Sequence, residues 1–485
     1  MKHENQNLVI IMSDEHNPKY LGCYGHELVS TPHLDALAAS GTVFENAYTP
    51  SPVCVPARAA FATGRPVHQI GYWDNATPYD GREVSWHHTL RQQGHQVVSI
   101  GKLHFSGEGR DHGFSEEQIP LHVLDGKGDL MGLVRDDLPV RGNAWKMARL
   151  AGPGESSYTL YDREIAARAQ IWLQEAANRD HAKPWCLFVS FVAPHFPLTA
   201  PPEYYYRYYN DPDLPMPKQY GQIPSHPFHQ DYARSFCYDD HFEDADNVRR
   251  AIAGYFGLCT FLDEQVGKVL GALDRTGLSD STRVLYLSDH GDSLGARGLW
   301  GKSNMYEEAV SVPLIAKGPY IPAGRRLSAP CSLLDVHPFI LETVGAEGDD
   351  TVRPGISLTQ QWQQPDCNRV IISEYHGMGS RTAAYMVRRR EWKYIHYADP
   401  AYPPELFNLV LDPEELIDLA AEPDCQTVRA ELLAELEQQL DPVETDRRAK
   451  AFQEALLNQH GGREVVIARG DLGFSPTPGS GADLR

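Results

Sequence analysis

The chain has 485 residues, a formal net charge of -21 and 42% hydrophobic residues. This length exceeds what one hydrophobic core normally fills, so we predict a large domain and a smaller one. So acidic a surface argues against nucleic acid or an anionic membrane as partner, and no apolar stretch is long enough to span a bilayer.

Buried strands alternate with helices through most of the chain. Residues 8–12 form a continuous apolar run of strand length, and a helix is expected from Thr31-Pro32 to Gly41. This alternation predicts an α/β domain, assigned to residues 1–365, whose large, mixed, mostly parallel sheet is sandwiched by helices. Its further elements are a helix at 87–93 and strands at 97–100, 185–192 and 284–288.

From about residue 366 the pattern changes, and we assign 366–485 to a smaller C-terminal α+β domain. Short strands separated by polar turns precede one charged helical region, which predicts an antiparallel sheet with a helix against it. The strands are expected at 371–374, 384–388 and 392–396, the helix at 427–457 and an irregular tail at 470–485. Two weakly periodic insertions, 110–157 and 201–244, are expected near the mouth of an active site.

The most specific segment is Ser51-Pro-Val-Cys54-Val-Pro56-Ala-Arg58, followed by Thr63-Gly64-Arg65. It places Cys-x-Pro-x-Arg at the start of a predicted helix. Free backbone N–H groups and the helix dipole attract an anion there, and Arg58, one turn on, adds positive charge. The structural alternative is a buried cysteine that merely begins a helix.

Carboxylates follow two of the predicted strands. Met12-Ser-Asp14-Glu15-His16 ends the first strand, and Leu287-Ser-Asp289-His290-Gly-Asp292 ends a later one. Hard oxygen ligands with one imidazole suit Ca²⁺, Mn²⁺ or Mg²⁺ better than a zinc site rich in soft ligands. An aspartate that caps a helix or a turn is the alternative for each segment taken singly.

Basic side chains follow other strands. Lys102 and His104 lie in Gly-Lys-Leu-His, His195 lies in Pro-His-Phe-Pro, and Lys302 follows the second acidic segment. Fixed cations in a dry site stabilise an anionic group in transfer, and an imidazole can protonate a leaving oxygen. A solvated lysine and a satisfied interior histidine are the structural alternatives.

Together these segments resemble the sulfatase family of the alkaline-phosphatase-like superfamily, near its arylsulfatase, choline sulfatase and phosphonate monoester hydrolase branches. Cys54, Pro56 and Arg58 match the family signature. The acidic and basic blocks match the family's remaining motifs, with two departures: Glu15 stands where many sulfatases have Asp, and His290 where many have Asn.

The resemblance implies hydrolysis of an aryl or alkyl sulfate monoester, a small anionic ester. Cys54 would be oxidised to formylglycine by a formylglycine-generating enzyme, and the aldehyde hydrate would be the nucleophile. One divalent metal, Ca²⁺ in first place with Mn²⁺ or Mg²⁺ as alternatives, would be held by position 54 together with Asp14, Asp289, His290 and Glu15, the last as a ligand or behind the ligands.

The resemblance also implies the roles of the basic residues. Lys102 and Lys302 would bind the sulfate oxygens, His195 would protonate the leaving alcohol, and His104 would assist deprotonation of the hydrate. Asn75 is a weaker candidate for contact with the transferred group, and an Asx turn explains it equally well. Glu374 is a candidate contact to the organic part of the substrate, against the alternative of an ordinary strand residue.

Several alternatives stay open at this level. A phosphonate monoester or phosphodiester hydrolase would use the same site, and a choline-sulfatase-type enzyme is a second alternative. A catalytically dead scaffold would be expected to have lost Cys54, Arg58 or a metal ligand, and all are present. Eight cysteines without a CxxC pair, and an N-terminal apolar run too short for a secretory signal, predict a cytoplasmic protein. A homo-oligomer is an open expectation.

Overall fold

A computed structural model describes residues 4–107 and 109–481. Its centre is an eight-stranded mixed sheet in the order β12-β2-β11-β9-β1-β7-β4-β5, in which only the pairings of β11 are antiparallel. The predicted large, mostly parallel sheet is therefore confirmed. Its strands are β1 Asn7–Asp14, β2 Thr42–Phe44, β4 Val97–Lys102, β5 Glu116–Leu121, β7 Cys186–Pro194, β9 Thr282–Ser288, β11 Leu314–Lys317 and β12 Arg325–Leu327.

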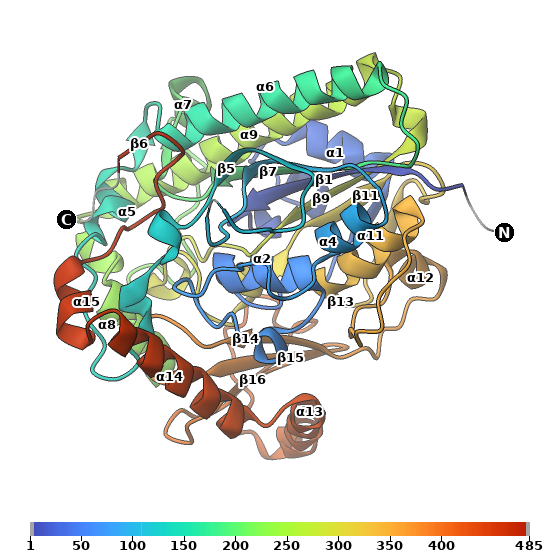
Figure 1. The fold of residues 1–485 in the computed structure, drawn as a ribbon. Coiled ribbons are helices and arrows are strands. Elements are labelled where there is room, and N and C mark those ends of the chain that lie inside the picture. Colours follow the sequence, from blue (N-terminus) through green and yellow to red (C-terminus); the bar gives the residue numbers. More distant parts are fainter. Residues whose placement is uncertain (1–3, 108, 482–485) are drawn as a thin grey trace.

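The sheet is buried on both faces, as the continuous apolar run of β1 predicts. Leu8, Ile10 and Met12 point into one core, and Val9 and Ile11 point into the other. Helices cover each face (Figure 1). On one side lie α1 Pro32–Ala39, α6 Ser157–Ala177 and α9 Ala245–Arg275, and on the other lie α2 Cys54–Thr63, α4 Trp86–Gln92 and α11 Val336–Val344.

A separate four-stranded antiparallel sheet lies near the C-terminal end of the sequence. It runs β14-β15-β16-β17, with bounds Ile371–Tyr375, Ala384–Arg389, Trp392–Tyr397 and Glu405–Asn408. The single helix expected at 427–457 is instead two, α13 Gln426–Gln439 and α14 Pro442–Gln459. Leu440 is extended, Asp441 caps the second helix and Pro442 is its first residue. The first helix does not continue through Pro442 because proline has no N–H for the helical hydrogen bond, whereas the first position of a new helix does not need one.

Shorter elements complete the chain. The helices are α3 Val67–Ile70, α5 Trp145–Arg149, α7 Pro202–Tyr209, α8 Pro227–Phe236, α10 Glu307–Val310, α12 Leu358–Gln363 and α15 Arg463–Arg469. The strands are β3 Ala47–Tyr48, β6 Gly152–Pro153, β8 Thr199–Ala200, β10 Ser311–Val312 and β13 Cys331–Ser332.

The tail predicted at 470–485 has no helix or strand over 470–481, and its last four residues lie outside the described part of the chain. All eight cysteines are free thiols. None of the helices in residues 4–107 and 109–481 combines the length and apolar character needed to cross a membrane.

Candidate active site

Four adjacent strands of the large sheet deliver the polar residues of the site. In the order β9-β1-β7-β4, all parallel, their carboxyl ends carry Asp289, Asp14, His195 and Lys102 respectively. Parallel strands end at a common edge, where open α/β sheets bind ligands. Residues far apart in the sequence are therefore neighbours in space.

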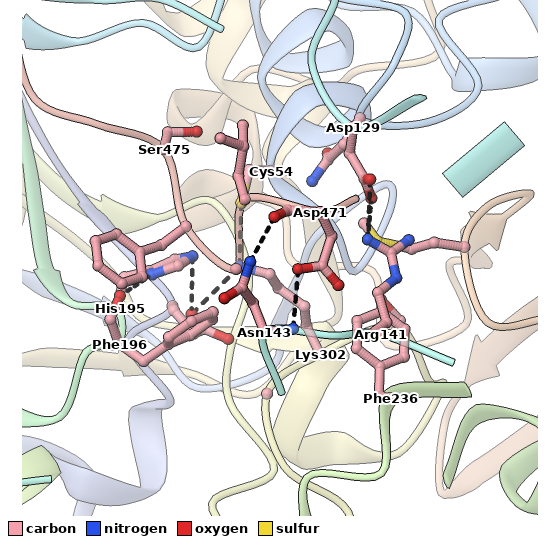
Figure 2. A pocket seen from close by; sticks show the side chains of 18 of the residues that line it. Cys54, Asp129, Arg141, Asn143, His195, Phe196, Phe236, Lys302, Asp471 and Ser475 are labelled. Atoms are coloured by element: carbon pink, nitrogen blue, oxygen red, sulfur yellow. Dashed lines mark hydrogen bonds and ion pairs between the residues drawn. The ribbon is translucent and has the colours of Figure 1, made fainter. Parts of the chain in front are cut away.

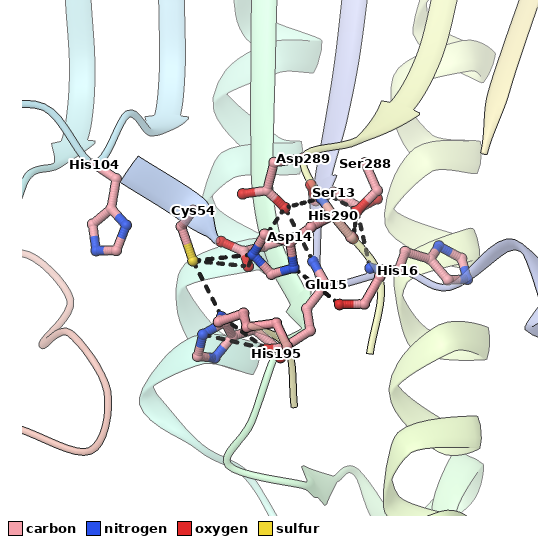
Figure 3. Close-up of polar contacts among 12 residues, drawn as sticks. Ser13, Asp14, Glu15, His16, Cys54, His104, His195, Ser288, Asp289 and His290 are labelled. Atoms are coloured by element: carbon pink, nitrogen blue, oxygen red, sulfur yellow. Dashed lines mark hydrogen bonds and ion pairs between the residues drawn. The ribbon is translucent and has the colours of Figure 1, made fainter. Parts of the chain in front are cut away.

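Cys54 is the first residue of α2 and is buried at this edge. Its Sγ lies 3.2 Å from His290 Nε2, 3.2 Å from Lys302 Nζ and 3.8 Å from Asp14 Oδ1 (Figure 3). Burial, with the charge of Asp14 beside it, raises the pKa of the Cys54 thiol to about 12. The unmodified thiol would thus be protonated at neutral pH and a poor nucleophile.

Arg58 lies one turn along α2 and is 2% exposed. Its Nε donates to Asp289 Oδ2 at 2.8 Å, and its Nη2 donates to Asp14 Oδ2 at 3.3 Å. Its Nη1 donates to the Lys102 carbonyl and to Ser190 Oγ, both at 2.9 Å. The guanidinium thus orients two carboxylates, and the charge that Arg58 would add beside the oxygen of the nucleophile stays a prediction.

Cys54 and three neighbouring side chains form a buried quartet of metal-binding residue types. Asp14, Cys54, Asp289 and His290 offer ligand atoms that all lie within 4.8 Å of one another. His290 Nδ1 donates to the Gly291 carbonyl at 2.9 Å, which leaves the Nε2 lone pair facing Sγ. Two carboxylates, one imidazole and an oxygen in place of sulfur would make a hard-ligand set, so these residues fit a divalent cation such as Ca²⁺.

Neighbouring cations keep Asp14 ionised. Burial alone would raise its pKa, but Lys102, followed by His195, Lys302 and Arg58, holds the pKa well below its ordinary value. An ionised carboxylate is the form that a metal ligand requires.

Glu15 lies outside the quartet, although it follows Asp14 directly. Its backbone is left-handed (φ 68°), and its carboxylate groups with Asp14 and His195. Oε2 lies 3.2 Å from Lys302 Nζ and 3.3 Å from His195 Nε2, while Oε1 has no hydrogen-bond partner. Burial raises the pKa of Glu15 to about 8, against the opposing charge of Lys302.

Lys102, His104, His195 and Lys302 all line the cavity at Cys54. The Lys102 ammonium contacts Asp14. His195 Nδ1 donates to the Phe196 carbonyl at 2.6 Å, which directs Nε2 toward Glu15. His104 stands apart from the contacts around Cys54 in Figure 3, and its Nε2 lies 2.7 Å from Ser475 Oγ.

The opposite side of the cavity comes mainly from the segments predicted as insertions, helix α8 among them, and from the tail (Figure 2). Both predicted insertions contribute, and so does the tail. The composition of these segments carries no signal for individual residues; only the abundance of turn residues marks the insertions. The residues are Asp129, Arg141, Asn143, Tyr232, Phe236, Tyr238, Asp471, Phe474 and Ser475, with Tyr158 from α6 and Phe196 after β7.

Several polar atoms on this side have no partner. Arg141 Nη1 lies 2.8–2.9 Å from the Asp129 carboxylate, and its guanidinium lies 5.0 Å from the centre of the Phe236 ring. Arg141 Nε, Asn143 Oδ1 and Asp471 Oδ2 are buried and have no hydrogen-bond partner among residues 4–107 and 109–481. Because buried polar atoms are costly unless satisfied, these three atoms are available to water or to a bound ligand.

Of the two weaker candidates for substrate contact, Asn75 lines the cavity and Glu374 does not. Asn75 lines the cavity and its Oδ1 accepts from the Val55 N–H at 3.1 Å, so it braces the start of α2. Glu374 is not among the cavity residues. It is 1% exposed, and its carboxylate lies 2.9 Å from both His68 Nδ1 and His376 Nε2. Glu374 stands behind the site, which corrects the prediction that it reaches the substrate.

Known proteins share this sequence pattern. A family model described as Sulfatase matches residues 6–346, and one described as N-sulphoglucosamine sulphohydrolase, C-terminal, matches residues 295–441. The chain therefore belongs to the sulfatase family and is a sulfuric ester hydrolase.

Two relatives and one solved structure show the extent of the likeness. The choline-sulfatase of Rhizobium meliloti (strain 1021) is 34% identical over 444 residues, 88% of this chain and 85% of its own length. Arylsulfatase K of Danio rerio is 30% identical over 451 residues, which cover 87% of this chain and 82% of the relative's own length. A protein solved in complex with its substrate D-glucosamine-2-N,6-O-disulfate has a TM-score of 0.73 at 24% identity, covering 91% of this chain and all of its own.

Proposed function

We propose that the enzyme cleaves sulfate monoesters with a formylglycine hydrate at position 54. The supporting observation is the surrounding of Cys54 Sγ by His290 Nε2, Lys302 Nζ and Asp14 Oδ1 within 3.2–3.8 Å. A formylglycine-generating enzyme would oxidise the side chain –CH₂–SH to –CHO with molecular oxygen, releasing the sulfur as sulfide, and water would add to give a geminal diol. The eight free thiols fit a reducing, cytoplasmic location.

In the first step, one diol oxygen, ionised by loss of its proton to water, attacks the sulfur of the ester. An O–S bond to residue 54 forms as the S–O bond to the alcohol breaks, and the alcohol oxygen takes a proton. His195 is placed to deliver it, since a proton held between its Nε2 and Glu15 Oε2, 3.3 Å apart, can pass to the leaving oxygen. Lys102 and Lys302 bind the remaining sulfate oxygens.

In the second step, the other diol hydroxyl loses its proton. The C=O bond reforms and the C–O bond to sulfate breaks, so the aldehyde is regenerated and sulfate leaves. Burial, with the charge of Lys102, holds the pKa of His104 well below its ordinary value, so the imidazole starts this step neutral and would take the proton as a weak base. Ser475, 2.7 Å from His104 Nε2, orients the ring.

Asp14, Asp289, His290 and residue 54 would hold one divalent metal, with Ca²⁺ preferred over Mn²⁺ or Mg²⁺ for an oxygen-rich set. When bound, the metal lowers the pKa of the hydrate and neutralises sulfate charge. Arg58 keeps both aspartates in position for it.

The alcohol part of the substrate would occupy the side built from the insertions and the tail. Arg141 Nε, Asn143 Oδ1 and Asp471 Oδ2 would form hydrogen bonds with polar groups of the alcohol, and the aromatic side chains of the cavity would pack against its carbon atoms. Arg141 already occupies the face of Phe236, which disfavours a quaternary ammonium there. This favours a hydroxylated alcohol over choline, the alcohol for which the Rhizobium meliloti relative is named.

A substrate panel tests both parts of the proposal. It compares kcat/KM for an aryl sulfate, choline sulfate, a polyhydroxylated alkyl sulfate, a phosphonate monoester and a phosphodiester. The sulfates should exceed the phosphorus esters, and the hydroxylated sulfate should exceed choline sulfate. Phosphonate preference would contradict the reaction, and choline preference would contradict only the alcohol. Peptide mass would show the aldehyde at position 54.

A further inference from the structure

A cluster of metal-binding residue types lies outside the cavity at Cys54. His112 precedes β5, Glu117 lies within this strand, and His122 follows it directly. The strand forms one edge of the large sheet. His112 Nδ1 lies 3.0 Å from Glu117 Oε1, and His122 Nε2 lies 3.5 Å from Glu117 Oε2. None of the three lines the cavity at Cys54.

The distances suit a small cation between the three side chains. One ligand atom from each residue lies within 4.8 Å of the other two. In a tetrahedral site with metal–ligand bonds of about 2.0–2.1 Å, neighbouring ligand atoms are about 3.3 Å apart. The two observed separations bracket that value. Two imidazoles and one carboxylate form a set that zinc uses with water in a fourth position.

One ring nitrogen of each histidine faces the Glu117 carboxylate. The His122 side chain is 9% exposed, and within the described part of the chain its Nε2 has only the 3.5 Å ion pair with Glu117, while its Nδ1 is buried without a partner. The remaining nitrogen of His112 lies 3.4 Å from Ser106 Oγ, which orients that ring as an outer partner does in metal sites.

The carboxylate supplies both charge and access. The Glu117 carboxylate lies between the two imidazoles and turns one oxygen toward each of them. Its side chain is 22% exposed, which opens the cluster to solvent on one side. The net charge of -21 also favours cation binding by the chain as a whole.

We propose that His112, Glu117 and His122 bind one divalent transition-metal ion of the Zn²⁺ class at the edge of the large sheet, separately from the metal at Cys54. The ion would tie β5 to the chain segment before it. Strand β5 is coupled to the catalytic side of the sheet, since the N–H groups of Leu103 and His104 donate to the carbonyl of Leu121, its last residue, at 3.1 and 2.8 Å.

The experiment uses the full chain, stripped with a chelator and then saturated with Ca²⁺ to fill the oxygen-rich site. Zn²⁺ is titrated by calorimetry into wild type, His122→Phe, Glu117→Gln and the control His33→Phe, an exposed histidine on α1. Co²⁺ replaces Zn²⁺ in a parallel series read by visible absorption. His122→Phe removes the ligand and the 3.5 Å pairing with Glu117 but keeps an aromatic ring beside His112, so folding should persist.

Wild type and His33→Phe should bind one more Zn²⁺ per chain than His122→Phe, and Glu117→Gln should bind it at least tenfold more weakly. Zn²⁺ should raise the Tm of wild type but not of His122→Phe. Equal stoichiometry in wild type and His122→Phe overturns the proposal. If circular dichroism shows that His122→Phe is unfolded, unchanged affinity in Glu117→Gln overturns it in the same way.

Discussion

At one end of the active-site cavity, charged side chains from the ends of parallel strands and from α2 contact one another directly. The guanidinium of Arg58, for example, donates hydrogen bonds to Asp14, Asp289, Ser190 and the carbonyl of Lys102. At the other end, insertions and the tail leave polar atoms of Arg141, Asn143 and Asp471 without partners. The end around Arg58 is organised before substrate binds, as catalysis of group transfer requires. In the proposed function, the end built from the insertions and the tail would bind the polar groups of the alcohol.

Replacing Cys54 should break the sulfuryl end completely. Cys54→Ala keeps the β-carbon but removes the thiol that its oxidation to the aldehyde requires, so kcat/KM should fall at least about 10³-fold with every sulfate ester. The measurement is initial rates, with folding checked by circular dichroism. Cys367→Ser, at an exposed free cysteine, is the matched control and should keep full activity. Retained turnover by Cys54→Ala would refute the nucleophile.

Metal removal should come next in size. Chelation should abolish turnover and lower Tm, because a ligand at 100 times its Kd stabilises the folded state by about 2.7 kcal/mol. Asp289→Asn should reproduce the loss, and Ca²⁺ should restore only the wild type. Full activity in protein shown by elemental analysis to be metal-free would contradict the quartet at Cys54.

His195→Asn should separate leaving-group chemistry from sulfate binding. With an alkyl sulfate, kcat should fall about 10²–10⁴-fold, because a poor leaving group needs the proton. With a nitrophenyl sulfate, whose phenolate leaves unaided, the loss should be far smaller. A loss of equal size with both substrates would show that His195 does not act as the acid.

Ser475→Ala tests the contact between the tail and the catalytic end. Loss of its hydrogen bond to His104 should lower kcat about 3–10-fold, since a typical hydrogen bond contributes about 0.5–1.5 kcal/mol. The pH profile of kcat should shift with it, which a purely structural change would not cause. Ser480→Ala, in the same tail but outside the cavity, is the control and should leave both unchanged.

Glu374→Gln should affect stability and hardly change activity. Burial opposes ionisation of Glu374, but His68 and His376 hold its pKa well below its ordinary value. Burial lowers the pKa of His68, and Glu374 outweighs this and raises it. The carboxylate's contribution is complete above about pH 4.3 and lost as pH falls, whereas that of His68 is complete below about pH 6.5 and lost as pH rises.

The variant should therefore lose about 1–3 kcal/mol of unfolding free energy, mostly between those two pH values. Urea denaturation at pH 5.5 and pH 8.5 would measure this. A fall in kcat/KM of more than about twofold would contradict this prediction and indicate that Glu374 contributes to substrate binding.

Much of this architecture follows from local pattern. The apolar run of β1 and the Thr31-Pro32 start of α1 are predictable because burial on two faces and helix initiation each leave a mark within a few residues. The prediction of one helix at 427–457 is wrong at Asp441-Pro442, although a proline after a capping aspartate is a helix-start signal. The orientation of Arg58 toward two carboxylates depends on strands over 40 and 230 residues away and has no local mark.

The amino-acid sequence by itself determined which residue types follow each strand and which segments form the large sheet, because short-range periodicity and motif spacing encode them. Only the tertiary structure decided that Glu15 turns from the quartet toward Lys302, that Glu374 stands behind the cavity, and that the tail reaches His104. Those outcomes depend on packing between distant segments, and no single segment carries that information.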